Sequence, residues 1–217
     1  MFINNYISKD FPAFDVNSSV SEALTIAEEF GFTHVFVKKN NVFYGGIFKE
    51  FLEENIDENI GSILHLAERF AILESNTILD SIKLFNTFNT NIIPVINKNE
   101  KYLGYIAYDD VFGELSKYPL FSENGALLTV ETSIKTYSMT EISKIVETNG
   151  LKFYGSFISF INEDVVQVTM KISNGNLASV DETFERYGYH VLHKFYNDEK
   201  EVLIKDRYQY FQKYLEF

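Results

Sequence analysis

The side chains that could carry chemistry in this sequence are a few histidines and paired carboxylates. His190 and His193 are three residues apart on a predicted strand, so they point to opposite faces and cannot bind one metal ion. Asp109 and Asp110 are adjacent, which sends their carboxylates in different directions. The sequence contains no cysteine, no glycine-rich phosphate-binding motif and no serine nucleophile elbow. These residues predict a non-enzymatic protein without catalytic residues, a metal site or a resident cofactor.

Composition and charge limit the classes of partner. The 217 residues, 46% of them hydrophobic, are enough for one large domain or two small ones. A net charge of −12 repels phosphate, which excludes nucleic acid as a partner. No apolar run reaches the roughly 18–20 residues that cross a bilayer, and the N-terminus lacks the features of a signal peptide. We therefore expect a cytoplasmic protein without a membrane partner.

Two groups of charged or titratable residues remain after this exclusion. His34 lies beside a predicted strand and His65 in a helical stretch, and we interpret both as core or surface histidines rather than catalytic bases. Five acidic residues cluster beyond residue 49, where a solvated helix face is the main interpretation and a site for a metal ion or a basic partner is the alternative. These residues are Glu50, Glu53, Glu54, Asp57 and Glu58.

The first half of the chain contains an internal repeat. Residues 19–24 resemble residues 77–82, and each stretch begins with a hydroxyl residue followed by an acid three positions later. This spacing predicts capping boxes formed by Ser19 with Glu22 and by Thr77 with Asp80. Each copy continues as an amphipathic helix, a strand, a polar turn, a glycine-containing strand and a closing helix, in a register that pairs Gly45 with Gly104.

The second half has a different element order. Strands are predicted at 127–134, 152–161, 165–172 and 189–196, and helices at 139–148 and 177–187. Ser138 is the predicted N-cap of the first of these helices. The resulting βαββαβ order predicts a ferredoxin-like unit. The fold class of the whole chain is therefore α+β, with mixed helices and sheets.

The repeat resembles a pair of cystathionine-β-synthase (CBS) domains, also called a Bateman module. Residues 92–96, followed by 101–111, are similar to the family's run of a PVV strand, a turn and the pattern hGhI(T/S)xxD. Residues 125–205 resemble an ACT domain, as in CBS–ACT proteins of the acetoin-utilisation type. The predicted domains are 1–118 for the CBS pair (repeats at about 1–60 and 61–118), 119–124 for a linker, 125–205 for the ACT-like domain and 206–217 for an aromatic tail.

This resemblance implies a nucleotide site between the paired domains. In the family, the Asp of the run binds the ribose hydroxyls, and a Thr or Ser three residues earlier helps to bind phosphate. The second copy keeps the carboxylate as Asp110 but has Ala107 at the hydroxyl position, whereas the first copy has Phe48 and Phe51. The resemblance therefore implies one retained site for AMP, ADP, ATP or S-adenosylmethionine at Asp110. Ile72, Ile93 and Pro94 are its expected walls.

The ACT-like half departs from its family in one loop. ACT domains that bind amino acids usually have a glycine between the first strand and the first helix, whereas residues 135–139 contain none. Tyr137 and Ser138 are the candidate ligand contacts there, although helix capping explains Ser138 without a ligand.

Two functions follow from the resemblance. The first is a regulatory protein, a homodimer, that senses a small ligand with its CBS pair and ACT-like unit. The second is a dimeric interaction scaffold with vestigial pockets, which the residues Phe48, Phe51 and Ala107 favour. The aromatic tail at 206–217 is expected to pack on its own chain or a dimer mate, or to dock on an unidentified protein partner.

Overall fold

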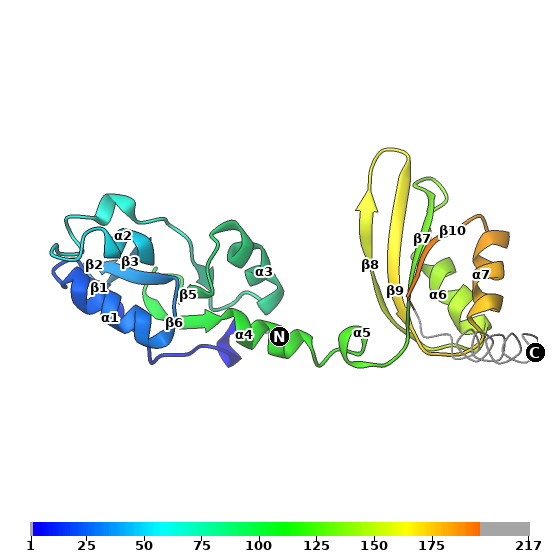
Figure 1. Ribbon diagram of the computed structural model, residues 1–217, viewed down its shortest axis with the longest axis horizontal. Coiled ribbons are helices and arrows are strands. Elements are labelled where there is room, and N and C mark those ends of the chain that lie inside the picture. Colours follow the sequence, from blue (N-terminus) through cyan, green and yellow to red (C-terminus); the bar gives the residue numbers. More distant parts are fainter. Residues whose placement is uncertain (1, 196–217) are drawn as a thin grey trace, which may run out of the picture. The chain divides into compact units, whose positions relative to one another are not determined.

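The computed structural model describes residues 2–195 and divides into two compact units, 1–115 and 116–217 (Figure 1). Unit 1 contains two clusters of buried hydrophobic residues and unit 2 contains one. The aromatic tail at 206–217 lies outside the described residues, so its predicted packing stays a prediction.

Unit 1 is built from two copies of one arrangement. The first copy consists of β1 (Ala13–Asp15), α1 (Val20–Phe30), β2 (His34–Lys39), β3 (Val42–Phe48) and α2 (Lys49–Glu53). The second consists of β4 (Ile72–Leu73), α3 (Ile78–Thr87), β5 (Ile92–Ile96), β6 (Tyr102–Ala107) and α4 (Tyr108–Leu115). In each sheet the first strand is parallel to the second, and the second is antiparallel to the third. The repeat and its element order are therefore confirmed.

The two helices that open the repeats begin differently. The Asp80 carboxylate accepts a hydrogen bond from the Thr77 backbone N–H at 2.8 Å, which confirms the predicted capping box and holds the pKa of Asp80 below its usual value. The capping box predicted at Ser19 is wrong, because its side chain forms no capping hydrogen bond. There, the Val20 N–H donates instead to the Glu58 carbonyl at 3.0 Å. The segment before the second repeat therefore supplies the hydrogen-bond acceptor for a free backbone N–H at the start of this helix.

Each repeat extends the sheet of the other with the segment that precedes its own first strand. Ser8 exchanges two backbone hydrogen bonds with Tyr105 of β6, at 2.8 and 2.9 Å. Glu68 exchanges two with Gly46 of β3, both at 2.8 Å. Ile3, which is fully buried, correspondingly lies in the core of the second repeat, and Ile60 lies in the core of the first. We call residues 2–12 and 59–71 the leading segments; their exchange makes the two repeats one folded unit.

Unit 2 is the predicted ferredoxin-like unit. It contains β7 (Ala126–Ser133), α6 (Met139–Thr148), β8 (Phe153–Ile161), β9 (Val165–Ile172), α7 (Leu177–Arg186) and β10 (His190–Phe195). The strands form an antiparallel sheet in the order β10-β7-β9-β8, with both helices on one face (Figure 1). Within the segment predicted as a linker, a short helix, α5 (Pro119–Ser122), places Leu120 against Gly155 of β8.

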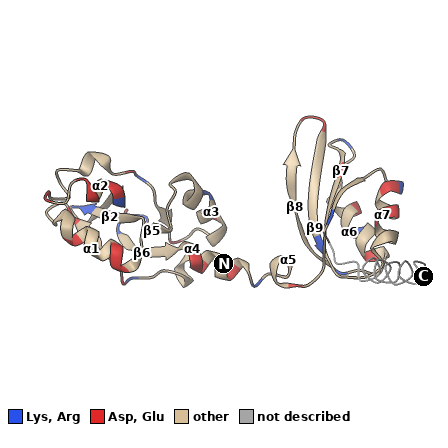
Figure 2. Cartoon of the chain, in the orientation of Figure 1, with Lys and Arg blue, Asp and Glu red and all other residues tan. Residues whose placement is uncertain are grey.

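The acidic cluster lies on the surface. Glu50 and Glu53 on α2, together with the acids that follow to residue 58, are all exposed. Figure 2 shows this red segment at α2. Their exposure agrees with the interpretation as a solvated face, and we find no group of three or more potential metal ligands within residues 2–195.

Candidate functional site

Asp110 lies in the first turn of α4, directly after β6. Its Oδ2 accepts a hydrogen bond from the Ala107 N–H at 3.4 Å, and the side chain is exposed. This is the position of an N-terminal capping carboxylate, which the positive end of the helix stabilises. The contact is long, so the carboxylate keeps most of its capacity to accept further hydrogen bonds.

Aromatic rings pack on the strand that leads to Asp110. Phe32 and Phe11 contact the Tyr105 ring edge-on, with ring centroids 5.1 and 6.0 Å away. Phe30 packs against Phe11 at 5.6 Å. We call this group, Asp110 with Ala107, Tyr105 and the three phenylalanines, the Asp110 corner. Rings from the first repeat thus pack on Tyr105, whose strand leads into the helix that carries Asp110.

The hydroxyl of Tyr105 connects this corner to a second carboxylate. It donates a hydrogen bond to Asp10 Oδ1 at 2.9 Å. Burial, this hydrogen bond and the negative charges of Asp10 and Asp110 raise the pKa of Tyr105 to about 12. The hydroxyl therefore stays protonated, and the corner presents hydrogen-bond acceptors in an acidic environment.

The expected walls lie on different sides of the second sheet. Ile72 and Ile93 are 3% and 0% exposed and belong to the core between the sheet and its own helices. Ile92, by contrast, packs in the core shared with the first repeat. Because side chains alternate along β5, Pro94 shares the face of Ile92, whereas Ile93 faces the opposite way. Ala107 is half-buried and, unlike these expected wall residues, belongs to the Asp110 corner, where its N–H donates to Asp110.

The equivalent place in the first repeat is filled with rings, and we call it the Phe51 corner. Phe48 lies 5.1 Å from the His34 ring and 6.3 Å from Phe51. Phe70, from a leading segment, stacks on Phe88 at 4.4 Å and meets His34 edge-on at 5.5 Å. Burial lowers the pKa of His34 to about 4, so its imidazole is neutral near pH 7. Phe51 occupies the position that corresponds to Asp110, and none of the described residues of the Phe51 corner supplies a carboxylate there instead.

Thr33 and Asn91 join the two corners and were not singled out from the sequence. The Thr33 N–H donates to Asn91 Oδ1 at 3.0 Å, and the Asn91 N–H donates to Thr33 Oγ1 at 3.2 Å. The two residues are 58 positions apart, the spacing of the repeat itself. Superimposing the two copies of the sequence would have paired them, as polar residues just before equivalent strands.

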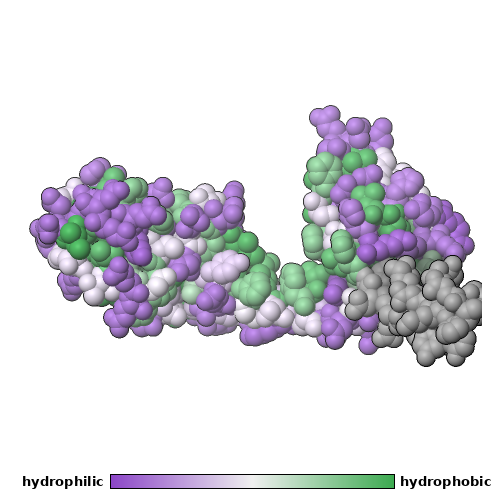
Figure 3. Space-filling model, in the orientation of Figure 1, coloured by the Kyte–Doolittle hydropathy of each residue, from purple (hydrophilic) through white to green (hydrophobic). Residues whose placement is uncertain are grey.

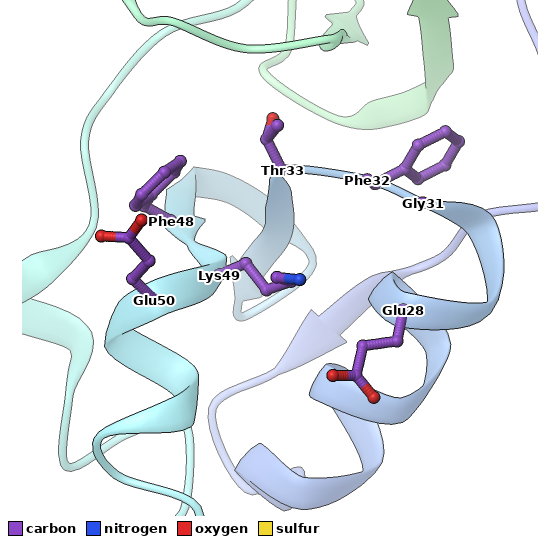
Figure 4. A pocket seen from close by; sticks show the side chains of 7 residues that line it. All are labelled: Glu28, Gly31, Phe32, Thr33, Phe48, Lys49 and Glu50. Carbon is purple, nitrogen blue, oxygen red and sulfur yellow. The ribbon is translucent and has the colours of Figure 1, made fainter.

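A cavity of about 380 Å³ opens beside the Phe51 corner (Figure 4). Lys49 reaches into the space between α1 and α2, where Glu28 also lies, whereas Glu50 points to the other side of α2 beside Phe48. Lys49 Nζ is 3.5 Å from Glu53, so it already has an ion-pair partner on its own helix. The Glu28 carboxylate on this cavity disfavours an anionic ligand.

The candidate contacts in unit 2 occupy the start of α6. Ser138 Oγ accepts a hydrogen bond from the Glu141 N–H at 3.2 Å, which confirms the predicted N-cap. Ser138 also lines a cavity of about 260 Å³ with Lys144 and Tyr187. Tyr137 is half-buried and packs against the core of unit 2.

The prediction that His190 and His193 point to opposite faces is wrong. A register shift between Val191 and His193 pairs the two histidines with Glu131 and Thr129, which lie on one face of β7. His190 Nδ1 pairs with Glu185 at 3.3 Å, and His65 is exposed.

In the part of the chain that the structure describes, no helix is both long and apolar enough to cross a bilayer.

Comparisons with known proteins locate one family within unit 1. Residues 66–117 match the CBS domain family. No curated protein matches the sequence. A CBS domain pair/ACT domain protein from Thermotoga maritima is 21% identical, with a TM-score of 0.47, over 53% of this chain and 96% of that chain.

Two further solved structures contain nucleotides. CBSX2 in complex with AMP is 14% identical, with a TM-score of 0.42, over 52% of this chain and 95% of that chain. The cytosolic domain of the Mg²⁺ channel MgtE in complex with ATP is 13% identical, with a TM-score of 0.43, over 50% of this chain and 46% of that chain. Residues 66–117 are thus similar in sequence to a CBS domain; a repeat of the same topology precedes them, and a ferredoxin-like unit follows them in an α+β fold.

Proposed function

We propose that this protein is a non-enzymatic, cytoplasmic regulatory protein that binds one adenine nucleotide at the Asp110 corner. The CBS match at residues 66–117 supports a regulatory role, since AMP and ATP are the ligands named for two similar structures. The ferredoxin-like topology of unit 2 fits an ACT-like sensor, so the resemblance to CBS–ACT proteins of the acetoin-utilisation type belongs to this proposal.

The exposed carboxylate of Asp110 carries the proposal. A carboxylate has two acceptor oxygens and can therefore take both hydroxyls of a ribose. Asp110 uses one oxygen for a single long hydrogen bond, at 3.4 Å to the Ala107 N–H. The Phe51 corner has a phenyl ring at the equivalent position, so the proposal assigns one nucleotide to the pair.

The surroundings of Asp110 orient the nucleotide. Asp10 and Asp109 are exposed and lie near the same strand end, so a phosphate is repelled from this side. Ala107 adds no hydroxyl donor for phosphate. Phe32 is half-buried, and its ring offers an apolar face for the base. The proposed pose therefore places ribose on Asp110, base beside Phe32 and phosphate toward solvent.

Replacing Asp110 by asparagine is expected to weaken AMP binding about ten- to a hundredfold. A hydrogen bond to a charged group contributes about 1.5–3 kcal/mol, which corresponds to that range of affinity. Isothermal titration calorimetry of the full chain with AMP, ADP and ATP measures the change, and S-adenosylmethionine is titrated in parallel.

The matched control is Asp109→Asn, which removes the same charge from the same helical turn. We expect its affinity to stay within about threefold of the wild type, because screened charges in water interact weakly. Equal losses in the two variants would reject a direct contact at Asp110. Absence of saturable binding to the wild-type protein at millimolar nucleotide would reject the nucleotide site.

A dimeric scaffold with closed pockets is the second candidate. The observation that favours it is the ring packing at both corners, where Phe11 and Phe70 are 0% and 3% exposed. Rings packed in this way add buried apolar surface and leave little room for a base. The calorimetry above separates the two candidates, since the scaffold binds none of the nucleotides.

Both candidates include a homodimer, which we propose forms through β8. This strand lies at an edge of its sheet, so one side of its backbone is free to pair with another strand. Four of its apolar side chains, Phe157, Ile158, Phe160 and Ile161, are 44–55% exposed. Figure 3 shows hydrophobic atoms along this side of unit 2.

Replacing Phe160 by lysine is expected to weaken dimerisation at least tenfold. A buried phenylalanine contributes about 1.5–3 kcal/mol to an interface, and a charge on an edge strand opposes pairing. Sedimentation velocity over a concentration series measures the effect. Tyr187→Lys is the control, since Tyr187 is also an exposed aromatic, at 55% against 46% for Phe160. A wild-type monomer, or the same shift in both variants, would contradict the β8 interface.

A further inference from the structure

Three lysines line a second cavity of unit 1, which shares Phe11 with the Asp110 corner. The cavity has a volume of about 290 Å³ and is lined by Lys9, Lys38 and Lys101. They come from three separate segments: the leading segment before β1, the end of β2 and the turn before β6. A volume of this size corresponds to roughly ten water molecules at about 30 Å³ each. The cavity can therefore hold a small ligand.

None of these three lysines forms an ion pair with a described carboxylate. Two acidic residues adjoin them in sequence, yet each binds elsewhere. Glu100 Oε1 accepts from the Arg69 guanidinium at 2.6 Å, and Asp10 accepts from the Tyr105 hydroxyl at 2.9 Å. The nearest acids in sequence are therefore held by other partners and leave the lysine charges available.

Backbone contacts hold the lining segments together. The Phe43 N–H donates to the Glu100 carbonyl at 2.8 Å, which ties the β2–β3 hairpin to the turn that carries Lys101. The Tyr102 hydroxyl donates to the Phe11 carbonyl at 2.9 Å, which fixes the wall beside the leading segment. Asn41, with a φ of 65°, completes the hairpin side of the cavity. The lysine stems thus start from fixed positions before any ligand binds.

Such a group of cations is unexpected in a chain with a net charge of −12. A concave site lined by charges of one sign concentrates its field and attracts ligands of the opposite sign. Lysine binds phosphate as a compact point charge. Three lysines therefore suit a ligand with several negative charges better than a ligand with a single carboxylate. Two lysines, Lys38 and Lys39, end β2, and this end of the strand is blue in Figure 2.

We propose that this cavity binds a small anion with at least two phosphate groups. The site differs from the Asp110 corner in its charged residues, which are three lysines instead of a carboxylate, although Phe11 borders both. Its ligand contacts are the ammonium groups of Lys9, Lys38 and Lys101, and we name this group the three-lysine site.

The test uses inorganic pyrophosphate as the probe and the full chain as the protein. Calorimetry at low ionic strength is expected to show saturable binding that weakens as salt is added. The variant Lys9→Gln/Lys38→Gln/Lys101→Gln is expected to lose at least about tenfold in affinity, since each charged contact is removed. Citrate, a carboxylate polyanion, is expected to bind more weakly than pyrophosphate.

The control variant removes three lysines that do not line the cavity: Lys39→Gln/Lys83→Gln/Lys98→Gln. It has the same net charge as the first variant, so an effect of overall charge lowers affinity equally in both. We expect the control to stay within about threefold of the wild type. Equal losses, tighter binding of citrate, or no saturable binding of pyrophosphate to the wild type would overturn the proposal. Asp110→Asn should leave pyrophosphate binding unchanged, and a loss there would also overturn it.

Discussion

Gly104→Ala is expected to destabilise unit 1 by about 4 kcal/mol, through strain of the backbone and a clash in a packed region. Gly104 has a φ of 146°, which side chains of L-residues rarely allow. A Cβ there would lie 2.2 Å from the Ser8 carbonyl oxygen, a backbone atom. Ser8 is tied to Tyr105 by two hydrogen bonds, so the leading segment cannot withdraw without breaking them. Urea unfolding of the full chain measures the loss.

Gly113→Ala is the matched control for this substitution. Gly113 lies in α4, and a Cβ there would meet nothing within 4 Å. Alanine favours a helix over glycine by about 1 kcal/mol, so this variant should be slightly more stable. If Gly104→Ala unfolds at the same urea concentration as Gly113→Ala, the exchange of leading segments is not the close contact described here.

Stability is expected to fall as the pH is lowered from about 7 to 4, with His34 as a major cause. The pKa of His34 is about 4 in the folded protein, against 6.5 for an unperturbed histidine. Between these values the unfolded chain binds a proton that the folded chain does not. Acid therefore favours unfolding, and the full contribution of His34 is present only above pH 6.5. The difference corresponds to about 3 kcal/mol, lost by about pH 4.

The variant His34→Asn separates this effect from that of the carboxylates. Its free energy of unfolding should depend less steeply on pH than that of the wild type between about pH 6.5 and 4, whatever its stability at neutral pH. His65→Asn, at an exposed site, should keep the wild-type slope. Identical slopes for wild type and His34→Asn in urea titrations would show that folding leaves the pKa of His34 unchanged, which would contradict its lowering by burial.

Much of the fold could be predicted from local patterns. The helix at Met139–Thr148 has the predicted bounds, and the strand order of unit 2 follows from the βαββαβ sequence. The equivalence of Gly45 and Gly104 in the two repeats was also predicted, but the reason why both positions need glycine was not. In the structure each glycine faces a carbonyl of the other repeat's leading segment, Glu68 or Ser8. Such long-range contacts leave no periodic signal near either residue.

The site was less predictable, because it depends on which face each side chain takes. Ile93 was expected to line the nucleotide site, but the pleat of β5 turns it into the core and brings Ile92 to the shared face. The capping box at Ser19 was wrong because a distant carbonyl, that of Glu58, caps the helix instead. The three-lysine site joins segments that are far apart in sequence, so no motif marks it.

Nucleotide binding at Asp110 can be located by titrating the ¹⁵N-labelled full chain with AMP and following the backbone amide chemical shifts. We expect saturable shifts that are largest at residues 105–111 and at Phe32 and Thr33, with little change at Phe48 and Phe51. Shifts confined to the Phe51 corner or to the three-lysine site, or no saturable shift, would contradict nucleotide binding at Asp110.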